Sequence, residues 1–228
     1  MRKLSDFCKS GVSKAELTKY LSSLTFVEVD SGVYDIADDV NLDGLGLNSL
    51  LEVTALLGKL TASKVPIRIR KVHGGFKCSN NRLKDLKGAP EEVGGSFVCH
   101  SNQLETLEGA PRYVGGDFEC GENNLKNLIG APQHVGGDFY CSRNQLVSLE
   151  GAPRRVEGNF VCSSNYLQTL QGAPEYVGRT FDCSNNQLIS FEGAPKYVGG
   201  MFICKFNPRK FTEEEIRKLI NVGGEIRV

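Results

Sequence analysis

The stretch GGDFYCSRNQLVSLEGAP, residues 136–153, is one copy of a motif that recurs every 21 residues through more than half of the chain. Cysteine marks this period most clearly, because seven of the eight cysteines are separated by intervals of 21 residues. They are Cys78, Cys99, Cys120, Cys141, Cys162, Cys183 and Cys204. A fixed period of this length indicates a structural unit that is stacked along a solenoid.

Other residue types keep the same period at fixed distances from the cysteine. Phenylalanine precedes each of these cysteines by two positions, asparagine follows by three, and a Gly-Ala-Pro triplet closes each complete unit. The alternation Phe-x-Cys has a period of two, which predicts a short strand with Phe and Cys pointing inward. Stacked units would then form a parallel sheet over a continuous core of Phe, Cys, Leu and Val.

The return to the next strand is predicted from residues such as Leu104, Leu107 and the triplet Gly109-Ala110-Pro111. Proline fixes φ and donates no hydrogen bond, so this leg is expected to be an irregular or polyproline-like arc and not an α-helix. The asparagine column is interpreted as structural, because inward amides at a tight turn can satisfy backbone groups that a sheet leaves unpaired.

The segment FxCxxNxL resembles the LxLxxNxL segment of leucine-rich repeats, and the similarity extends from Val72 to Asn207. The short period and the LxxLxGAP return resemble the bacterial-effector subclass of these repeats. Residues 136–153 are most similar to leucine-rich-repeat proteins encoded by tailed bacteriophages. The resemblance implies an α/β repeat fold, namely a leucine-rich-repeat solenoid with a parallel β-sheet on its concave face, and it implies protein binding.

Three regions are predicted: an N-terminal α/β cap at 1–71, the solenoid at 72–207, and a C-terminal helix and short strand cap at 208–228. The pair Ser13 and Glu16 forms a capping box before a helix expected near 14–23. Thr212 and Glu215 form another before a helix that should end at Leu219 or Ile220.

The N-terminal cap also contains two features that interrupt the repeat. Val40-Asn41-Leu42 has the pattern of one more repeat strand. A second helix is expected at 48–61, with Asn48 or Ser49 as its N-cap, because Leu50, Val53, Leu57 and Leu60 fall on one helical face.

The composition disfavours several classes of function. Lys plus Arg equals Asp plus Glu at 27 each, so a nucleic-acid partner is not expected. No window approaches the roughly 18 apolar residues of a membrane span, and a cytoplasmic location is expected, in the host cytoplasm if a phage encodes the chain. The cysteines are interpreted as reduced core thiols, because no CxxC pair occurs and His73, His100 and His134 share no column.

No cofactor or catalytic group is predicted. The string Asp39-Val40-Asn41-Leu42-Asp43-Gly44 fits the opening of an EF-hand loop, but Leu50 stands at position 12, where a bidentate Glu is needed. The same residues also fit a repeat strand. No Ser, His and acidic group can be placed together, so the protein is expected not to be an enzyme.

The candidate protein-binding site is the outward face of the sheet, where side chains do not pack in the core. Acidic residues cluster there beside an aromatic residue and apolar neighbours, which is a common anatomy for an interface. The candidates are Val98, Asp117, Glu119, Glu122, Asp138, Tyr140, Val161 and Asp182. The alternative is that these strand residues are merely solvated.

Two functional hypotheses follow. The first is a non-enzymatic module that binds a host or viral protein through the concave face, as a phage-encoded inhibitor or modulator of a host protein. The second is a structural or assembly protein that self-associates, as a homo-oligomer, through its N-terminal cap. The leucine-rich helix at 48–61 could cap the core, dimerise or dock on a partner, with core capping favoured.

Overall fold

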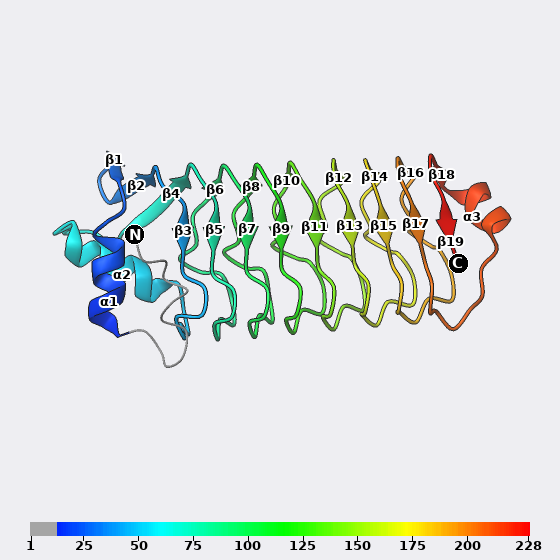
Figure 1. Cartoon of the computed structure of the whole chain (residues 1–228), viewed down its shortest axis with the longest axis horizontal. Helices are drawn as coiled ribbons and strands as arrows, with labels where there is room; N and C mark the ends of the chain where they lie inside the picture. The colour runs from blue at the N-terminus through cyan, green and yellow to red at the C-terminus, as the bar shows by residue number, and fades with distance from the viewer. Residues whose placement is uncertain (1–12) are drawn as a thin grey trace.

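The computed structural model describes residues 13–228, in which short strands stack as successive turns along one axis (Figure 1). Helices α1 (Lys14–Leu21) and α2 (Leu51–Leu60) lie at one end of the stack, and α3 (Glu213–Leu219) lies at the other (Figure 1). The predicted leucine-rich-repeat solenoid is therefore confirmed. Residues 1–12 of the predicted N-terminal cap lie outside the described residues.

The predicted parallel sheet contains nine strands of two residues each. They are β3 (Val40–Asn41), β5 (Phe76–Lys77), β7 (Phe97–Val98), β9 (Phe118–Glu119), β11 (Phe139–Tyr140), β13 (Phe160–Val161), β15 (Phe181–Asp182), β17 (Phe202–Ile203) and β19 (Ile226–Arg227). The pairing of Val40 with Phe76 confirms that residues 40–42 begin another repeat turn.

A second layer of strands was not predicted from the sequence, and it is parallel except for the antiparallel pair of its first two strands. Its strands from residue 92 to residue 198 follow the Gly-Ala-Pro triplets. One sheet contains β1 (Phe26–Asp30), β2 (Val33–Ile36), β4 (Arg68–Val72), β6 (Glu92–Val93), β8 (Tyr113–Val114) and β10 (His134–Val135). Another contains β12 (Arg155–Val156), β14 (Tyr176–Val177), β16 (Tyr197–Val198) and β18 (Asn221–Val222). The return leg is thus not helical, as expected, but it is more regular than an irregular arc.

The core lies between the two layers of strands, and the repeating residues fill it. Phe76 through Phe202 are at most 1% exposed, and neighbouring rings stack with centroids 5.1 to 5.7 Å apart. The Leu and Val columns of the repeats are also buried. One continuous hydrophobic cluster runs from Leu17 to Ile226, so both caps share the core of the repeats.

The asparagine ladder is confirmed, and Asn123 shows its geometry. Its Nδ2 donates to the carbonyl oxygens of Cys99 and Cys120, each at 3.1 Å. Its Oδ1 accepts from the backbone amide of Leu104 at 2.9 Å. Each amide therefore joins its own turn to the preceding one and satisfies buried backbone groups.

The glycine of each Gly-Ala-Pro triplet is required by both conformation and space. Gly151 has φ +93°, and a Cβ at this position would overlap the backbone of Leu128 and Ile129 in the preceding turn. A side chain is disfavoured at such a φ, and the backbone cannot move aside. Glycine here allows successive return legs to pack directly against each other.

The second layer is interrupted between β10 and β12, where Glu157 replaces the first glycine of the Gly-Gly pair. A Cβ at Gly136 or Gly178 would overlap a carbonyl oxygen of the preceding turn. Glu157 carries a Cβ, so its turn must stand farther from Gly136. In agreement, the amide of Gly158 is 3.2 Å from the carbonyl of Gly137, whereas the preceding contacts of this series measure 2.8 to 2.9 Å.

The helices match their predicted positions with shifted ends. Helix α1 starts after the predicted capping box but stops at Leu21. Helix α2 starts at Leu51 with Leu50 as its N-cap, so Asn48 and Ser49 were wrong as N-cap candidates. The Glu52 carboxylate accepts from both of their amides at 3.2 Å, and Ser49 Oγ accepts from the first helical amide, that of Leu51, also at 3.2 Å.

The buried face of α2 differs slightly from the prediction. Leu50, Val53 and Leu57 are buried as expected, but Leu60 is 38% exposed. At the other end, Thr212 and Glu215 form the expected capping box of α3, which ends at Leu219. Within residues 13–228, no helix is long and apolar enough to cross a membrane.

Candidate functional site

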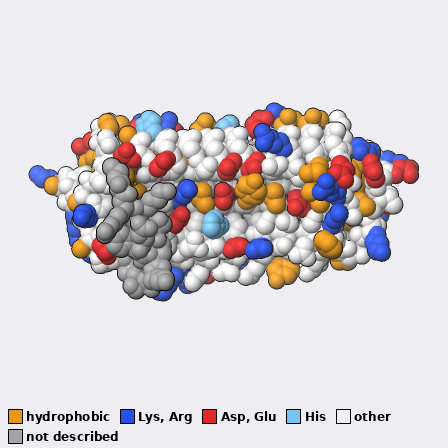
Figure 2. All heavy atoms as spheres, in the orientation of Figure 1, with side chains coloured by type: hydrophobic (Ala, Val, Ile, Leu, Met, Phe, Trp, Pro, Cys, Tyr) orange, Lys and Arg blue, Asp and Glu red, His pale blue; other side chains and the backbone are white. Residues whose placement is uncertain are grey.

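The nine-stranded sheet brings five of the eight candidate residues into one row on its outward face. Parallel pairing aligns the second residue of each strand, and we call the part of this row from β7 to β15 the central column. It consists of Val98, Glu119, Tyr140, Val161 and Asp182. Figure 2 shows a band across the middle of this face in which hydrophobic and acidic side chains alternate.

Members of the central column differ in exposure. Val98 is only 8% exposed, so its contribution to a contact surface is small, contrary to its expected role as an open flank. The other four side chains are half-buried. A half-buried side chain is already ordered by its neighbours and still has surface to offer a partner.

Asp117 and Asp138 lie beside the central column, but their carboxylates bind the protein's own backbone. Asp117 Oδ1 accepts from the amide of Asp138 at 2.8 Å, and Asp138 Oδ1 accepts from the amide of Asn159 at 2.7 Å. A Cβ at Gly137 would overlap the Asp117 carboxylate, so the glycine makes room for this contact. Their first role is to join successive turns.

The same contact recurs in other turns with different residue types, and we call it the polar ladder. Asp39 Oδ1 accepts from the amide of Gly75, Ser96 Oγ from Asp117, and Asn159 Oδ1 from Thr180. This ladder was not predicted from the sequence, because no single residue type recurs in it. The available signal was a short side chain with an acceptor oxygen directly before the inward strand residue.

Tyr140 and Asp138 are joined by a short hydrogen bond between their side chains. The Tyr140 hydroxyl donates to Asp138 Oδ2 at 2.6 Å. This hydrogen bond, together with burial and the nearby negative charge, raises the pKa of Tyr140 to about 12. Burial raises the pKa of Asp138, but the hydrogen bonds from Tyr140 and Asn159 outweigh it and leave the pKa below its usual value.

Glu122 does not belong to the central column. It lies in the turn after the strand with φ +56° and is exposed. Its carboxylate accepts from Ser101 Oγ at 2.8 Å and pairs with Arg143 at 2.7 Å, and these contacts lower its pKa. Among the predicted acidic residues, Glu122 is therefore neutralised locally.

Glu119 and Asp182 are the acidic residues that the structure leaves most available. Within residues 13–228, no hydrogen bond or ion pair engages the carboxylate of Glu119. Asp182 Oδ1 accepts only a local hydrogen bond, from the amide of Ser184 at 2.9 Å. Of the expected acidic patch, these two side chains retain the capacity to pair with a partner's cation.

The calcium-like string forms β3 and its flanks, which is the strand alternative that the sequence left open. Asp39 Oδ1 and Asp43 Oδ1 each accept at 2.6 Å, from the amides of Gly75 and Ser79. Asn41 Oδ1 accepts from the amide of Asp43 at 3.0 Å. The oxygens that would face a cation in an EF-hand loop serve backbone amides here.

The seven cysteines of the repeats are buried free thiols, as their inward strand positions predicted. Burial, reinforced by neighbouring groups, raises the pKa of Cys141 well above its usual value. The effect is smaller for Cys204 near the end of the solenoid, where burial raises the pKa to about 11. Such thiols are poor nucleophiles at neutral pH.

A ladder of planar side chains on the second layer was also not predicted. Tyr113 stacks on His134 with centroids 4.7 Å apart, and Arg155 lies 3.7 Å above the ring of Tyr176, which stacks on Tyr197. The interior ring faces contact each other. The ladder therefore joins neighbouring turns of the second layer.

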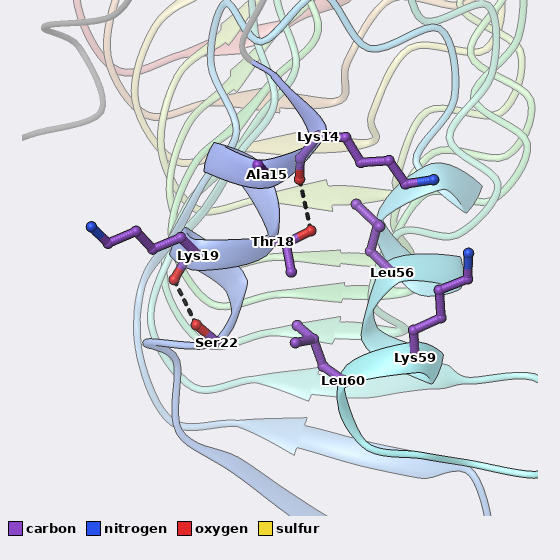
Figure 3. Close-up of a pocket in the computed structure, with 8 residues that line it drawn as sticks. All are labelled: Lys14, Ala15, Thr18, Lys19, Ser22, Leu56, Lys59 and Leu60. Atoms are coloured by element: carbon purple, nitrogen blue, oxygen red, sulfur yellow. Dashed lines mark hydrogen bonds between the residues drawn. The ribbon is translucent and has the colours of Figure 1, made fainter.

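The rival interface at the N-terminal end contains a groove between α1 and α2 (Figure 3). Its lining residues are Lys14, Ala15, Thr18, Lys19, Ser22, Leu56, Lys59 and Leu60. Leu56 and Leu60 point toward α1, Lys14 and Lys59 extend toward the same side, and Lys19 points away (Figure 3). Because the buried face of α2 packs on the repeats, the helix caps the core and leaves only its outer edge free.

Comparison with known proteins found little. No protein-family model matches the chain, and no curated protein resembles it in sequence. Among solved structures, YopM from Yersinia enterocolitica WA-314 is similar, with 20% identity and a TM-score of 0.47. The match covers 75% of this chain and 38% of YopM. A similarity this distant carries no information on function.

Proposed function

We propose that this protein is a non-enzymatic protein-binding module and that its contact surface is the outward face of the nine-stranded sheet. The observation that carries the proposal is the central column, where Glu119, Tyr140, Val161 and Asp182 stand in register without filling the core. An aromatic and an apolar side chain flanked by charges is a frequent composition of protein interfaces.

Affinity capture from a bacterial lysate tests this function. The wild-type chain is compared with a variant that carries Tyr140→Ala and Glu119→Arg, which alters the central column and leaves the backbone hydrogen bonds of the polar ladder in place. Tyr166→Ala with Glu150→Arg is the matched control, because it makes the same exchanges at exposed residues outside the column. We expect the wild type and the control to capture partner proteins that the Tyr140 variant does not capture. If every partner survives in the variant, this face is not the interface.

The identity of the partner is the finer part of the proposal. We propose a host or viral protein, with the module acting as a phage-encoded inhibitor or modulator in the host cytoplasm. The resemblance of the repeat sequence, such as residues 136–153, to phage-encoded repeats supports this proposal. Affinity capture from infected and from uninfected cells of a host bacterium tests this proposal. If neither capture yields a partner protein, the proposal is excluded.

Self-association through the N-terminal cap is the second candidate, and exposed apolar side chains favour it. Val27, Val29 and Leu51 are 52%, 44% and 52% exposed, and β1 is an edge strand of its sheet. Exposed apolar groups beside an open strand edge favour contact with another chain. Sedimentation velocity at micromolar concentration decides this candidate. A dimer that Leu51→Glu dissociates supports it, and a monomer excludes it.

A further inference from the structure

Four consecutive strands present an ordered chemical pattern on the outward face. From β9 to β15 the central column reads Glu119, Tyr140, Val161 and Asp182, so two acidic groups enclose an aromatic and an apolar side chain. The Glu119 carboxylate has no partner within the described residues, and Asp182 makes only its local contact with Ser184. A complementary partner would present a cation, two apolar groups and a second cation in one line.

The spacing of the turns determines which backbone can present such a line. Neighbouring strands of such a sheet lie about 4.7 to 4.9 Å apart, and the inward Phe rings of these four turns have centroids 5.2, 5.1 and 5.5 Å apart. An α-helix advances about 5.4 Å per turn, so it places one side chain over each strand. In an extended chain, side chains on the same face recur about every 6.8 Å and lose register with the strands within three turns.

We propose that the central column binds an α-helix that lies across the strands. Its contact face carries Lys or Arg at positions i and i+11 and apolar residues at i+4 and i+7. The cations pair with Glu119 and Asp182, while the apolar residues cover Tyr140 and Val161. This proposal rests on the function proposed above and adds the chemical class of the partner element.

The neighbouring column gives the helix room. The residues that directly follow the cysteines on these four strands are Gly121, Ser142, Ser163 and Ser184. Their small side chains let a helix backbone come close to the sheet. The residues at either end of this strip, His100 and Lys205, are larger, so the flat region has the length of the acidic-apolar-acidic pattern.

Designed peptides test the proposal directly. The first is an alanine- and glutamine-based helix of about 20 residues with Arg at i and i+11 and Leu at i+4 and i+7. A second peptide has the same composition with these four residues dispersed around the helix. A third contains Glu in place of both Arg residues. Fluorescence anisotropy measures the Kd of each peptide for the intact chain.

Charge reversal on the protein supplies the decisive comparison. The test variant combines Glu119→Lys with Asp182→Lys, and the control combines Glu150→Lys with Glu192→Lys on the exposed return legs. Both variants change the net charge equally. We expect the wild type and the control to bind the aligned Arg helix at least about tenfold more tightly than the dispersed peptide. The test variant should lose this preference and gain affinity for the Glu helix, which also shows that it is folded.

Several results would overturn the proposal. These are equal affinity for the aligned and dispersed peptides, equal loss of affinity in both variants, or binding of a proline-containing extended peptide as tight as that of the helix. The function itself is judged separately, by a photoreactive residue at position 203 in cell lysate, because Ile203 pairs with Asp182 at the end of the central column and is not one of its members. Crosslinks to a loop or strand of a partner would support the binding function and contradict the helical partner. If no protein is crosslinked, the binding function itself is contradicted.

Discussion

The carboxylate of Asp117 accepts a 2.8 Å hydrogen bond from the backbone amide of Asp138, one turn further along the solenoid. Asp138 repeats the contact with Asn159 at 2.7 Å. Two acidic side chains on the open face of the sheet therefore act as structural connectors. An outward position in a repeat does not by itself identify a binding residue, because its side-chain oxygen can already accept a hydrogen bond from a backbone amide of the next turn.

Removal of the Asp138 acceptor should destabilise the fold. Asp138→Ala leaves the amide of Asn159 and the hydroxyl of Tyr140 without their partner, which costs about 1 to 3 kcal/mol. Asp138→Asn keeps an acceptor oxygen, as Asn159 does in the next turn, and should cost less than half as much. Urea unfolding measures both losses.

Glu119→Ala is the control, because its carboxylate engages no group among the described residues. We expect its unfolding free energy to stay within about 0.5 kcal/mol of the wild type. Equal stability of the Asp138→Ala and Glu119→Ala variants would show that the polar ladder contributes nothing.

The Asp138 and Tyr140 pair predicts opposite dependences on pH. The pKa of Asp138 is lowered, so its ionised form stabilises the fold above the usual value, and this stability is lost as pH falls through the folded value. The pKa of Tyr140 is raised to about 12, so its neutral form stabilises the fold below about 10, and this stability is lost as pH rises toward 12.

Ultraviolet titration of the tyrosinate checks the alkaline part. The difference between the wild type and Tyr140→Phe should have its midpoint near pH 12. Asp138→Asn removes the charge that holds the phenol neutral, so the midpoint should move toward about 10. An unchanged midpoint would mean that Asp138 does not control the hydroxyl.

Positions occupied by a single residue type made the first sheet predictable. Phe, Cys and Asn each recur at one place in every turn, so their inward direction and their stacking follow from the period. Val40 was recognised for the same reason, since it has the apolar pattern of the column that contains Phe76.

Contacts in which different residue types play the same structural role could not be predicted from the period. In the polar ladder, Ser96, Asp117 and Asn159 supply the same acceptor. The N-cap position of α2 falls on Leu50, whose side chain cannot accept a hydrogen bond, and Ser49 Oγ accepts from the first helical amide, that of Leu51. From β6 onward, the strands of the second layer contain two residues each, which is too short for an alternating pattern to be visible.

Glycine at the first position of the Gly-Gly pair should be required where the second layer is continuous. A Cβ at Gly136 would overlap the carbonyl oxygen of Gly115, so Gly136→Ala should cost about 1 to 3 kcal/mol and separate β8 from β10. Glu157→Ala is the matched control, because this position already carries a Cβ. Urea unfolding and amide exchange of the His134–Val135 strand measure the effect, and equal stability of the two variants would contradict the packing argument.

The buried thiols should differ in reactivity along the solenoid. Only the thiolate attacks a disulfide reagent, and burial raises the pKa of Cys141 more than that of Cys204, whose pKa is about 11. In a Cys8→Ser variant at pH 8, we expect a disulfide reagent to label Cys204 first and Cys141 much later, through opening of the fold. Denaturant should expose all seven repeat thiols at once. Mass spectrometry of the labelled peptides gives the order, and labelling of Cys141 as early as Cys204 would show that burial does not protect the column.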